Sequence, residues 1–190
     1  MKTIIVATNN KNKAKEIKEI LPNYNVLTLA DIGFEEEIEE NGTTFLENAV
    51  IKAMTISKFN DSLVLADDSG LEVDHLNGEP GVYSKRFANS DSERIEKMLR
   101  LLDGAQYRKA RFKCAVAITK GEEVIADFEG VLEGKIACVP NGNNGFGYDP
   151  IFIPENYSDT LATLSSAEKN SISHRGKAFS KAAEFLAKIL

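Results

Sequence analysis

Hydrophobic and polar positions along the chain follow the periods of strands and helices in turn. Short apolar runs at residues 3–7 and 64–66 are typical of buried strands. Residues 111–119 alternate apolar and polar side chains, and the pattern returns after a short turn at residues 124–132, which predicts an antiparallel hairpin. A further apolar run at residues 151–153 predicts another strand. The sheet is therefore expected to be mixed rather than purely parallel.

Apolar residues three and four positions apart predict the helices. The first helix has Ala14, Ile17, Ile20 and Leu21 on one face and ends at Pro22. Ser or Thr followed three residues later by Glu, the capping-box pattern, opens three of the others. These other helices are expected at residues 44–53, 90–102, 165–170 and 178–189.

Composition and charge exclude several classes of protein. The 190 residues are 43% hydrophobic and 27% charged, which is ordinary for a globular chain, and we expect a single domain over residues 1–190 with two lobes sharing one core. The net charge of −6 argues against a nucleic-acid binder, because such a protein needs a basic surface. A small anionic ligand stays possible, since a few Lys and Arg residues suffice for a pocket. No apolar run approaches the roughly 18 residues of a membrane span.

The N-terminus and the cysteines bear on localisation. Residues 1–7 are too short and turn polar too soon for a signal peptide. Cys114 and Cys138 lack the spacing of metal ligands, and Cys114 lies in an alternating strand, which favours a reduced thiol in the core. We therefore expect a cytoplasmic protein.

Two adjacent carboxylates, Asp67 and Asp68, follow the apolar run at residues 64–66. The strand is expected to end there and to turn at Ser69-Gly70. Carboxylates this close resist joint ionisation, and a hard cation such as Mg²⁺ is the usual remedy and binds phosphate as well. Glu40, directly before a predicted helix, is a candidate third ligand. The alternatives are a solvated Asp-Asp turn and a solvated acidic loop at residues 35–40.

A polar turn rich in amides joins the first strand to the first helix. Backbone N–H groups at a helix start favour anions, and Lys13 adds a point charge that suits a phosphate oxygen. The turn lacks the glycines of a Walker loop, and Lys13 alone is equally compatible with a solvated helix lysine. The turn consists of Thr8, Asn9, Asn10, Lys11, Asn12 and Lys13.

Three later segments also carry candidate chemistry. Residues 141–150 are dense in Gly and Asn and present Phe146 and Tyr148, which suggests either a platform for a base or aromatic plugs of the core. His174 is one of only two histidines, and it is compatible with a ligand donor or a satisfied helix cap. Residues 82–87 place two cations beside aromatics, a pattern for which we favour a surface or subunit contact over a phosphate contact.

Taken together, these segments resemble the inosine/xanthosine triphosphate pyrophosphatase family, and the resemblance runs nearly from end to end. Five motifs occur in order, which makes the match specific. They are Thr-x-Asn-x-x-Lys at residues 8–13, Glu-x-Gly-x-Thr-Phe-x-Glu-Asn-Ala at 40–49, Ala-Asp-Asp-Ser-Gly-Leu at 66–71, Phe-Gly-Tyr-Asp-Pro at 146–150, and Ser-His-Arg-Gly at 173–176 with Lys169 upstream. Lys85 and Asn144 depart from the usual pattern.

The resemblance implies an ITPase-like fold, an elongated α/β protein with a mixed β-sheet, flanking helices and two lobes around a central nucleotide cleft. It also implies a homodimer that hydrolyses ITP, dITP and XTP to the monophosphate and pyrophosphate with Mg²⁺. Glu40 and Asp68 would hold the metal, and Asp68 would be the catalytic proton acceptor. The implied substrate contacts are Thr8, Asn9, Asn10, Lys11, Asn12, Lys13, Ser69, Phe146, Gly147, Tyr148, Asp149, Lys169, His174 and Arg175.

Within this reading, Phe146 would stack on the base, and Lys169, His174 and Arg175 would read its edge. Two alternatives stay open at the level of sequence. One is a related pyrophosphatase of pyrimidine or other modified nucleotides, and the other is a module that binds nucleotides without hydrolysing them.

Overall fold

A six-stranded mixed sheet organises the computed structural model, which describes residues 1–59 and 61–190. The strands lie in the order β2-β1-β3-β4-β5-β6. Their bounds are β1 (Lys2–Val6), β2 (Tyr24–Thr28), β3 (Val64–Val73), β4 (Lys109–Lys120), β5 (Glu123–Ile136) and β6 (Phe152–Pro154). β1 runs parallel to β2 and β3, whereas every other pairing is antiparallel, so the prediction of a mixed sheet is confirmed.

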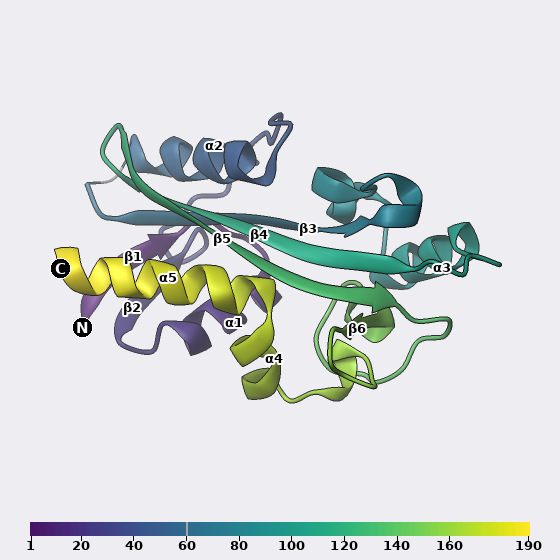
Figure 1. The fold of residues 1–190 in the computed structure, drawn as a ribbon. Helices are drawn as coiled ribbons and strands as arrows, with labels where there is room; N and C mark the ends of the chain where they lie inside the picture. The colour runs from purple at the N-terminus through teal and green to yellow at the C-terminus, as the bar shows by residue number, and fades with distance from the viewer. Residues whose placement is uncertain (60) are drawn as a thin grey trace.

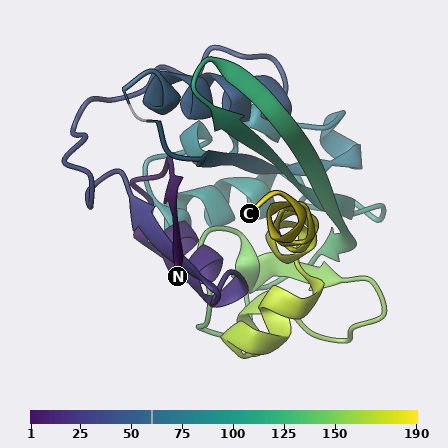
Figure 2. The same ribbon diagram turned by 90° about the vertical axis from the view of Figure 1, so that its left-hand side faces the viewer.

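Helices cover both faces of this sheet at the end that holds the two chain termini (Figures 1 and 2). One face packs against α2, and the other packs against α1 and α5. The helices are α1 (Lys11–Ile20), α2 (Phe45–Ser57), α3 (Asp91–Leu101), α4 (Ser166–Ile172) and α5 (His174–Ile189), and 3₁₀ turns include η2 (Gly81–Arg86). The buried side chains of β1 alternate between the two layers, as the period of two requires.

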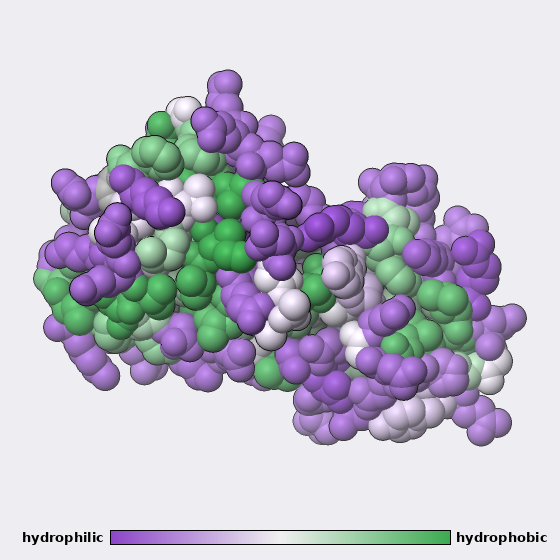
Figure 3. All heavy atoms as spheres, turned by 90° about the horizontal axis from the view of Figure 1, so that it is seen from above, coloured by the Kyte–Doolittle hydropathy of each residue, from purple (hydrophilic) through white to green (hydrophobic). Residues whose placement is uncertain are grey.

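The long strands β3, β4 and β5 continue out of this first lobe into a second one, which also contains α3 and β6 (Figure 1). A separate apolar cluster fills the second lobe and includes Leu71, Met98, Phe112 and Phe152. Seen from the side of α2, the molecule consists of two offset masses with hydrophilic side chains between them (Figure 3). The two lobes therefore share strands but have separate apolar clusters.

The strand with the two aspartates does not turn where the sequence suggested. β3 continues through Ser69 and Gly70 to Val73 and pairs with β4 along its whole length, so the predicted turn at Ser69-Gly70 is wrong. The glycine at position 70 instead allows the backbone at Gly81 to lie close to β3, because a Cβ at Gly70 would lie 2.3 Å from the carbonyl oxygen of Gly81. The strand therefore passes the two aspartates with its alternation of faces intact.

Local capping explains where the helices begin. Thr44 and Glu47 form the predicted capping box of α2, and Ser165 and Glu168 form that of α4. At α3, Ser90 accepts from the backbone of Glu93, but the Glu93 carboxylate accepts from Asn89, so this box is incomplete. α1 begins at Lys11, earlier than predicted, because the Asn10 side chain caps it.

Gly130 lets the start of α5 approach β5, and its replacement tests this packing. A Cβ at Gly130 would lie 2.0 Å from the carbonyl oxygen of His174, which is backbone and cannot rotate away. We expect Gly130→Ala to lower the free energy of unfolding by about 1–3 kcal/mol, as overpacking does. Urea unfolding measures this loss. Glu129→Ala, on the neighbouring exposed residue, is the control, and equal stabilities of the two variants would contradict the packing.

Candidate functional site

A cleft of about 620 Å³ lies between the two lobes, beside the end of β1. β1 pairs with β3 only at Val64 and Leu65, and Asp68, Ser69 and Gly70, further along β3, line the cleft. Ligands of open α/β sheets bind at such carboxyl ends of strands. The lining combines the polar turn before α1, the acidic loop before α2, the middle of β3, η2, and the loop before β6.

The adjacent carboxylates of Asp67 and Asp68 point to opposite faces of the sheet, because successive residues of a strand alternate. Asp67 contacts Lys13 and Arg175 on the side of α1 and α5, whereas Asp68 contacts Asn48 of α2. Asp67 does not line the cleft, but Asp68 and Ser69 do. The closest ion-pair partners of the two carboxylates therefore differ: Lys13 and Arg175 pair with Asp67, and Lys52 lies near Asp68.

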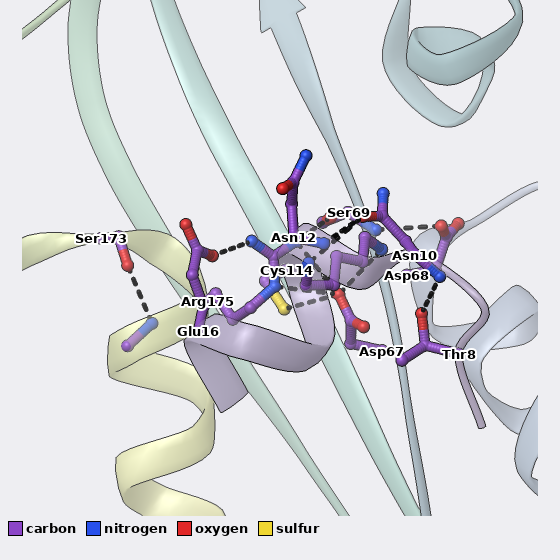
Figure 4. A network of polar contacts seen from close by, with 12 residues as sticks. Thr8, Asn10, Asn12, Glu16, Asp67, Asp68, Ser69, Cys114, Ser173 and Arg175 are labelled. Carbon is purple, nitrogen blue, oxygen red and sulfur yellow. Dashed lines mark hydrogen bonds and ion pairs between the residues drawn. The ribbon is translucent and has the colours of Figure 1, made fainter. Parts of the chain in front are cut away.

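Asp67 is the centre of a buried ion-pair network, shown in Figure 4. Its Oδ2 atom lies 2.9 Å from Lys13 Nζ and 3.2 Å from Arg175 Nη2, and both Asp67 and Arg175 are only 2% exposed. Burial alone would raise the pKa of Asp67, but the charges of Lys13 and Arg175 outweigh burial and hold this pKa well below its usual range. Asp67 is therefore an anion that fixes two cations.

Glu16 of α1 extends this network, although it was not among the predicted site residues. Its two carboxylate oxygens lie 2.8 Å from Lys169 Nζ and 2.7 Å from Arg175 Nη1. Burial raises the pKa of Glu16, but Arg175 and Lys169 more than offset this and keep it low. Lys169 also pairs with Asp149, whose pKa is nevertheless raised by its burial. In the sequence, Glu16 looks like an ordinary solvated residue of a helix. Its burial and its ion pairs are evident only from the packing of α4 and α5 against α1.

Asp68 has a different environment on the other face. Asn48 donates to it at 3.1 Å, and Lys52 Nζ lies 3.7 Å from its Oδ1 and 3.0 Å from Glu40 Oε2. Burial raises the pKa of Asp68, the nearby Glu40 raises it further, and Lys52 opposes both. Asn48 and Lys52, one helical turn apart on α2, were not among the predicted site residues. Their spacing on an otherwise apolar face is the signal that could have identified them.

The ammonium group between Glu40 and Asp68 shows that these two carboxylates converge on a position where a cation is stable. Among residues 1–59 and 61–190, no group of three or more His, Cys, Asp or Glu side chains is arranged to hold a metal ion. Mg²⁺ typically takes one or two carboxylates, several waters and substrate phosphates. The pair Glu40 and Asp68 therefore fits a metal that is bound together with a phosphate ligand.

The amide-rich turn supplies donors at the start of α1. Thr8 Oγ1 accepts from the Asn10 backbone at 3.1 Å, and Asn10 Oδ1 accepts from the N–H groups of Asn12 and Lys13. All the predicted contacts of this turn line the cleft except Lys11, which is exposed and outside the lining. The N-terminal end of α1 thus faces the cleft, where its dipole favours an anion.

An aromatic ring and two cations form another part of the lining of the cleft. Lys169 Nζ lies 4.6 Å and Arg175 Cζ lies 5.8 Å from the centre of the Phe146 ring. The loop that carries Phe146 is held by two carboxylates, since Asp149 accepts from the backbone N–H of Phe146 and Asp91 accepts from that of Gly147. Phe146 is therefore placed to offer a flat face to a ligand.

Tyr148 and His174 are both buried, with 4% and 5% of their surface exposed. An aromatic residue on which a base stacks would be more exposed. Tyr148 packs in the second apolar cluster and donates to the carbonyl oxygen of Ser84. His174 stacks on Phe112 with a centroid distance of 4.7 Å, and burial holds its pKa well below the usual value. Its Nδ1 atom has no hydrogen-bond partner within the described part of the chain. His174 is thus a neutral imidazole at the wall of the cleft.

Comparisons with known proteins agree over nearly the whole chain. The model of the Ham1 family matches residues 4–185. The dITP/XTP pyrophosphatases of Bacillus licheniformis and Bacillus subtilis are 49% and 50% identical, and each alignment covers 98% of both chains. The structure of the Staphylococcus aureus Ham1 protein superposes with a TM-score of 0.89 at 41% identity, covering 100% of each chain.

The Asp67 network predicts a specific dependence of stability on pH. A carboxyl whose pKa is lower in the folded state stabilises the fold above its unfolded pKa of about 3.9, and this contribution is lost as the pH falls further. We expect Asp67→Asn to lower the free energy of unfolding by about 3–5 kcal/mol at pH 7, because the partly buried Lys13 loses its counter-charge and the buried Arg175 loses one of its two.

This difference between the wild type and Asp67→Asn should shrink below a pH of about 4. Urea unfolding at neutral and acidic pH measures it, with Asp127→Asn, an exposed carboxylate of β5, as the control. A difference that does not vary with pH would show that Asp67 is not a buried anion.

Proposed function

This chain belongs to the Ham1 family, and we propose that it is a nucleoside-triphosphate pyrophosphatase that hydrolyses the deaminated purine nucleotides ITP, dITP and XTP to the monophosphate and pyrophosphate. The observation that carries this proposal is the convergence of Glu40 and Asp68 on one cation position, beside the helix start that carries Thr8 to Lys13. A phosphate chain bound at the helix start would reach the metal position without leaving the cleft.

The charge of the cleft supports a metal-complexed substrate. Carboxylates are as numerous as cations in its lining, and they include the exposed Glu35, Glu36 and Glu37 at the acidic loop. A free triphosphate would meet as much repulsion as attraction in such a cleft. Glu40 and Asp68 would hold Mg²⁺, which when bound neutralises negative charge on the phosphates and on the pyrophosphate leaving group.

In this proposal, Asp68 would orient and deprotonate the attacking water. Its carboxylate is held by the side chain of Asn48 and by the backbone N–H of Ser69, so it has one preferred orientation. Lys13 is held by Asp67 at the edge of the cleft, where its ammonium can donate to a phosphate oxygen while it stays paired. General acid–base catalysis by a positioned carboxylate contributes about 10²–10⁴-fold in rate.

The base end of the cleft accounts for selectivity. Four of the five N–H groups of Arg175 bind Asp67, Glu16 and Ser69, and Lys169 uses two of its three on Glu16 and Asp149. Each cation therefore keeps one donor for a ligand. Hypoxanthine and xanthine present a carbonyl oxygen at position 6, whereas adenine presents an amino group that would stay unpaired at a cost of about 1–3 kcal/mol.

We also propose that the enzyme is a cytoplasmic homodimer. Tyr83 of η2, which is 62% exposed, is a candidate for the subunit contact predicted at residues 82–87. In the described residues, no helix has the length and apolar character needed to cross a membrane.

Pyrophosphate release from a panel of nucleotides tests the function. We expect release from dITP and XTP with Mg²⁺, little release from dATP, and none after chelation, because the phosphates need the metal and the donors of Lys169 and Arg175 need the carbonyl oxygen at position 6. Release from dATP equal to that from dITP would keep the metal site but contradict the role of Lys169 and Arg175. Absence of release from every nucleotide would contradict the enzyme itself.

Replacement of Asp68 tests the catalytic assignment. We expect Asp68→Asn to lower kcat for dITP by about 10²–10⁴-fold, as loss of a positioned base does, while the circular dichroism spectrum stays unchanged. Asp127→Asn removes an exposed carboxylate outside the cleft and should behave as the wild type. Near-full turnover of Asp68→Asn at saturating Mg²⁺ would show that another group activates the water.

A further inference from the structure

The cations of the cleft fall into two groups according to their partners. Within the described residues, five of them lie within 4 Å of a carboxylate. The pairs are Lys13 with Asp67, Lys52 with Glu40 and Asp68, Arg94 with Asp91, Lys169 with Asp149 and Glu16, and Arg175 with Asp67 and Glu16. Lys85 and Arg86 also line the cleft, and neither has an ion pair in the part of the chain that the structure describes. These two residues carry the uncompensated positive charge.

Of these two residues, Arg86 is the better placed to contact a ligand bound near Glu40. It is the last residue of η2, and η2 is joined to the second lobe through Ser84, whose Oγ accepts from the Leu71 backbone and whose carbonyl oxygen accepts from Tyr148. The Arg86 guanidinium reaches back to the loop before α2, where Nη2 donates to the carbonyl oxygen of Glu40 at 3.2 Å. It is therefore the side chain that connects the second lobe to the metal position.

The guanidinium keeps most of its donors for a ligand. Arg86 is exposed, its Cζ lies 5.7 Å from the Tyr83 ring, and the bond to Glu40 uses one of its five N–H groups in the described chain. A guanidinium binds phosphate oxygens through two parallel N–H groups, which an ammonium cannot do. A phosphate chain bound to a cation held by Glu40 and Asp68 would lie near this fork, because Arg86 already contacts the backbone of Glu40.

We propose that Arg86 binds the phosphoryl groups that leave as pyrophosphate, a role that rests on the proposed function. In the reaction, the oxygen of water bonds to the α-phosphorus and the bond from this phosphorus to the oxygen that bridges the α- and β-phosphoryl groups breaks. The bridging oxygen keeps the electron pair and leaves as part of pyrophosphate. The water proton passes to Asp68. Arg86 stabilises the charge that develops on the leaving group, as preorganised donors do in other transition states.

The hydrogen bond to Glu40 gives Arg86 a second possible role, that of holding the acidic loop in place. A residue with only this role would change the Mg²⁺ concentration needed for activity but would not change the affinity for free pyrophosphate. Product inhibition separates the two roles, because pyrophosphate contains the leaving phosphoryl groups and dIMP does not.

The experiment compares Arg86→Ala, Arg86→Lys and Lys85→Ala with the wild type, using dITP as substrate. The control is Arg100→Ala, which removes an exposed arginine in the last turn of α3, outside the cleft. For Arg86→Ala we expect kcat to fall by about 10²–10³-fold, as on loss of an oxyanion donor. The inhibition constant for pyrophosphate should rise roughly tenfold or more, since hydrogen bonds to a charged group are lost. The inhibition constant for dIMP should stay unchanged.

Arg86→Lys, which retains the charge but loses the fork, should recover part of the pyrophosphate affinity and little of kcat. Wild-type inhibition constants in Arg86→Ala, or a change confined to the Mg²⁺ requirement, would overturn the proposal. A large effect of Lys85→Ala with none for Arg86→Ala would overturn it as well. Thermal unfolding of each variant excludes loss of the fold, and a wild type that releases no pyrophosphate would instead overturn the proposed function.

Discussion

The buried pair of Asp67 and Arg175 is the interaction on which the rest of the structure depends. It joins β3 to α5, and Lys13 and Glu16 add α1 to the same network. Three elements that are distant in the sequence thereby become one rigid unit beside the cleft. Burial of these charges is tolerated because each ion has at least one partner of opposite sign, and removal of one partner would leave the others without compensation.

Strand alternation gives the two adjacent aspartates different tasks. Asp67 faces α1 and α5 and pairs with Lys13 and Arg175, so its role is structural: it holds these two helices against β3. Asp68 faces α2 and lines the cleft, and its burial raises its pKa. A single strand thus supplies an anchor on one face and a candidate catalytic group on the other, with no backbone change between them.

The position of the cleft follows from the different lengths of the strands. β1 ends at Val6, whereas β3, β4 and β5 continue into the second lobe. The end of β1 therefore leaves an edge of β3 open between two apolar clusters, and the helix start at Asn10 lies at this opening. Residues from both lobes converge there, which explains why a cation such as Arg86 of η2 can contact the loop of Glu40.

The sequence by itself determined the mixed sheet, the helices with their caps, and the segments that line the cleft, because periodicity, capping residues and motifs are local properties. Sequence motifs also identified Phe146, Lys169 and Arg175 as candidate site residues, but they did not identify the carboxylates that hold these residues in place. Only the tertiary structure decided that β3 passes straight through Ser69-Gly70, since these residues pair with Cys114 and Lys113 of the distant strand β4. Glu16 contributes to the site for the same reason, because its burial and its charge compensation depend on contacts with α4 and α5 that no local pattern contains. For Asn48 and Lys52 the helical spacing was a local signal, but their contacts with Asp68 and Glu40 were set by the tertiary structure.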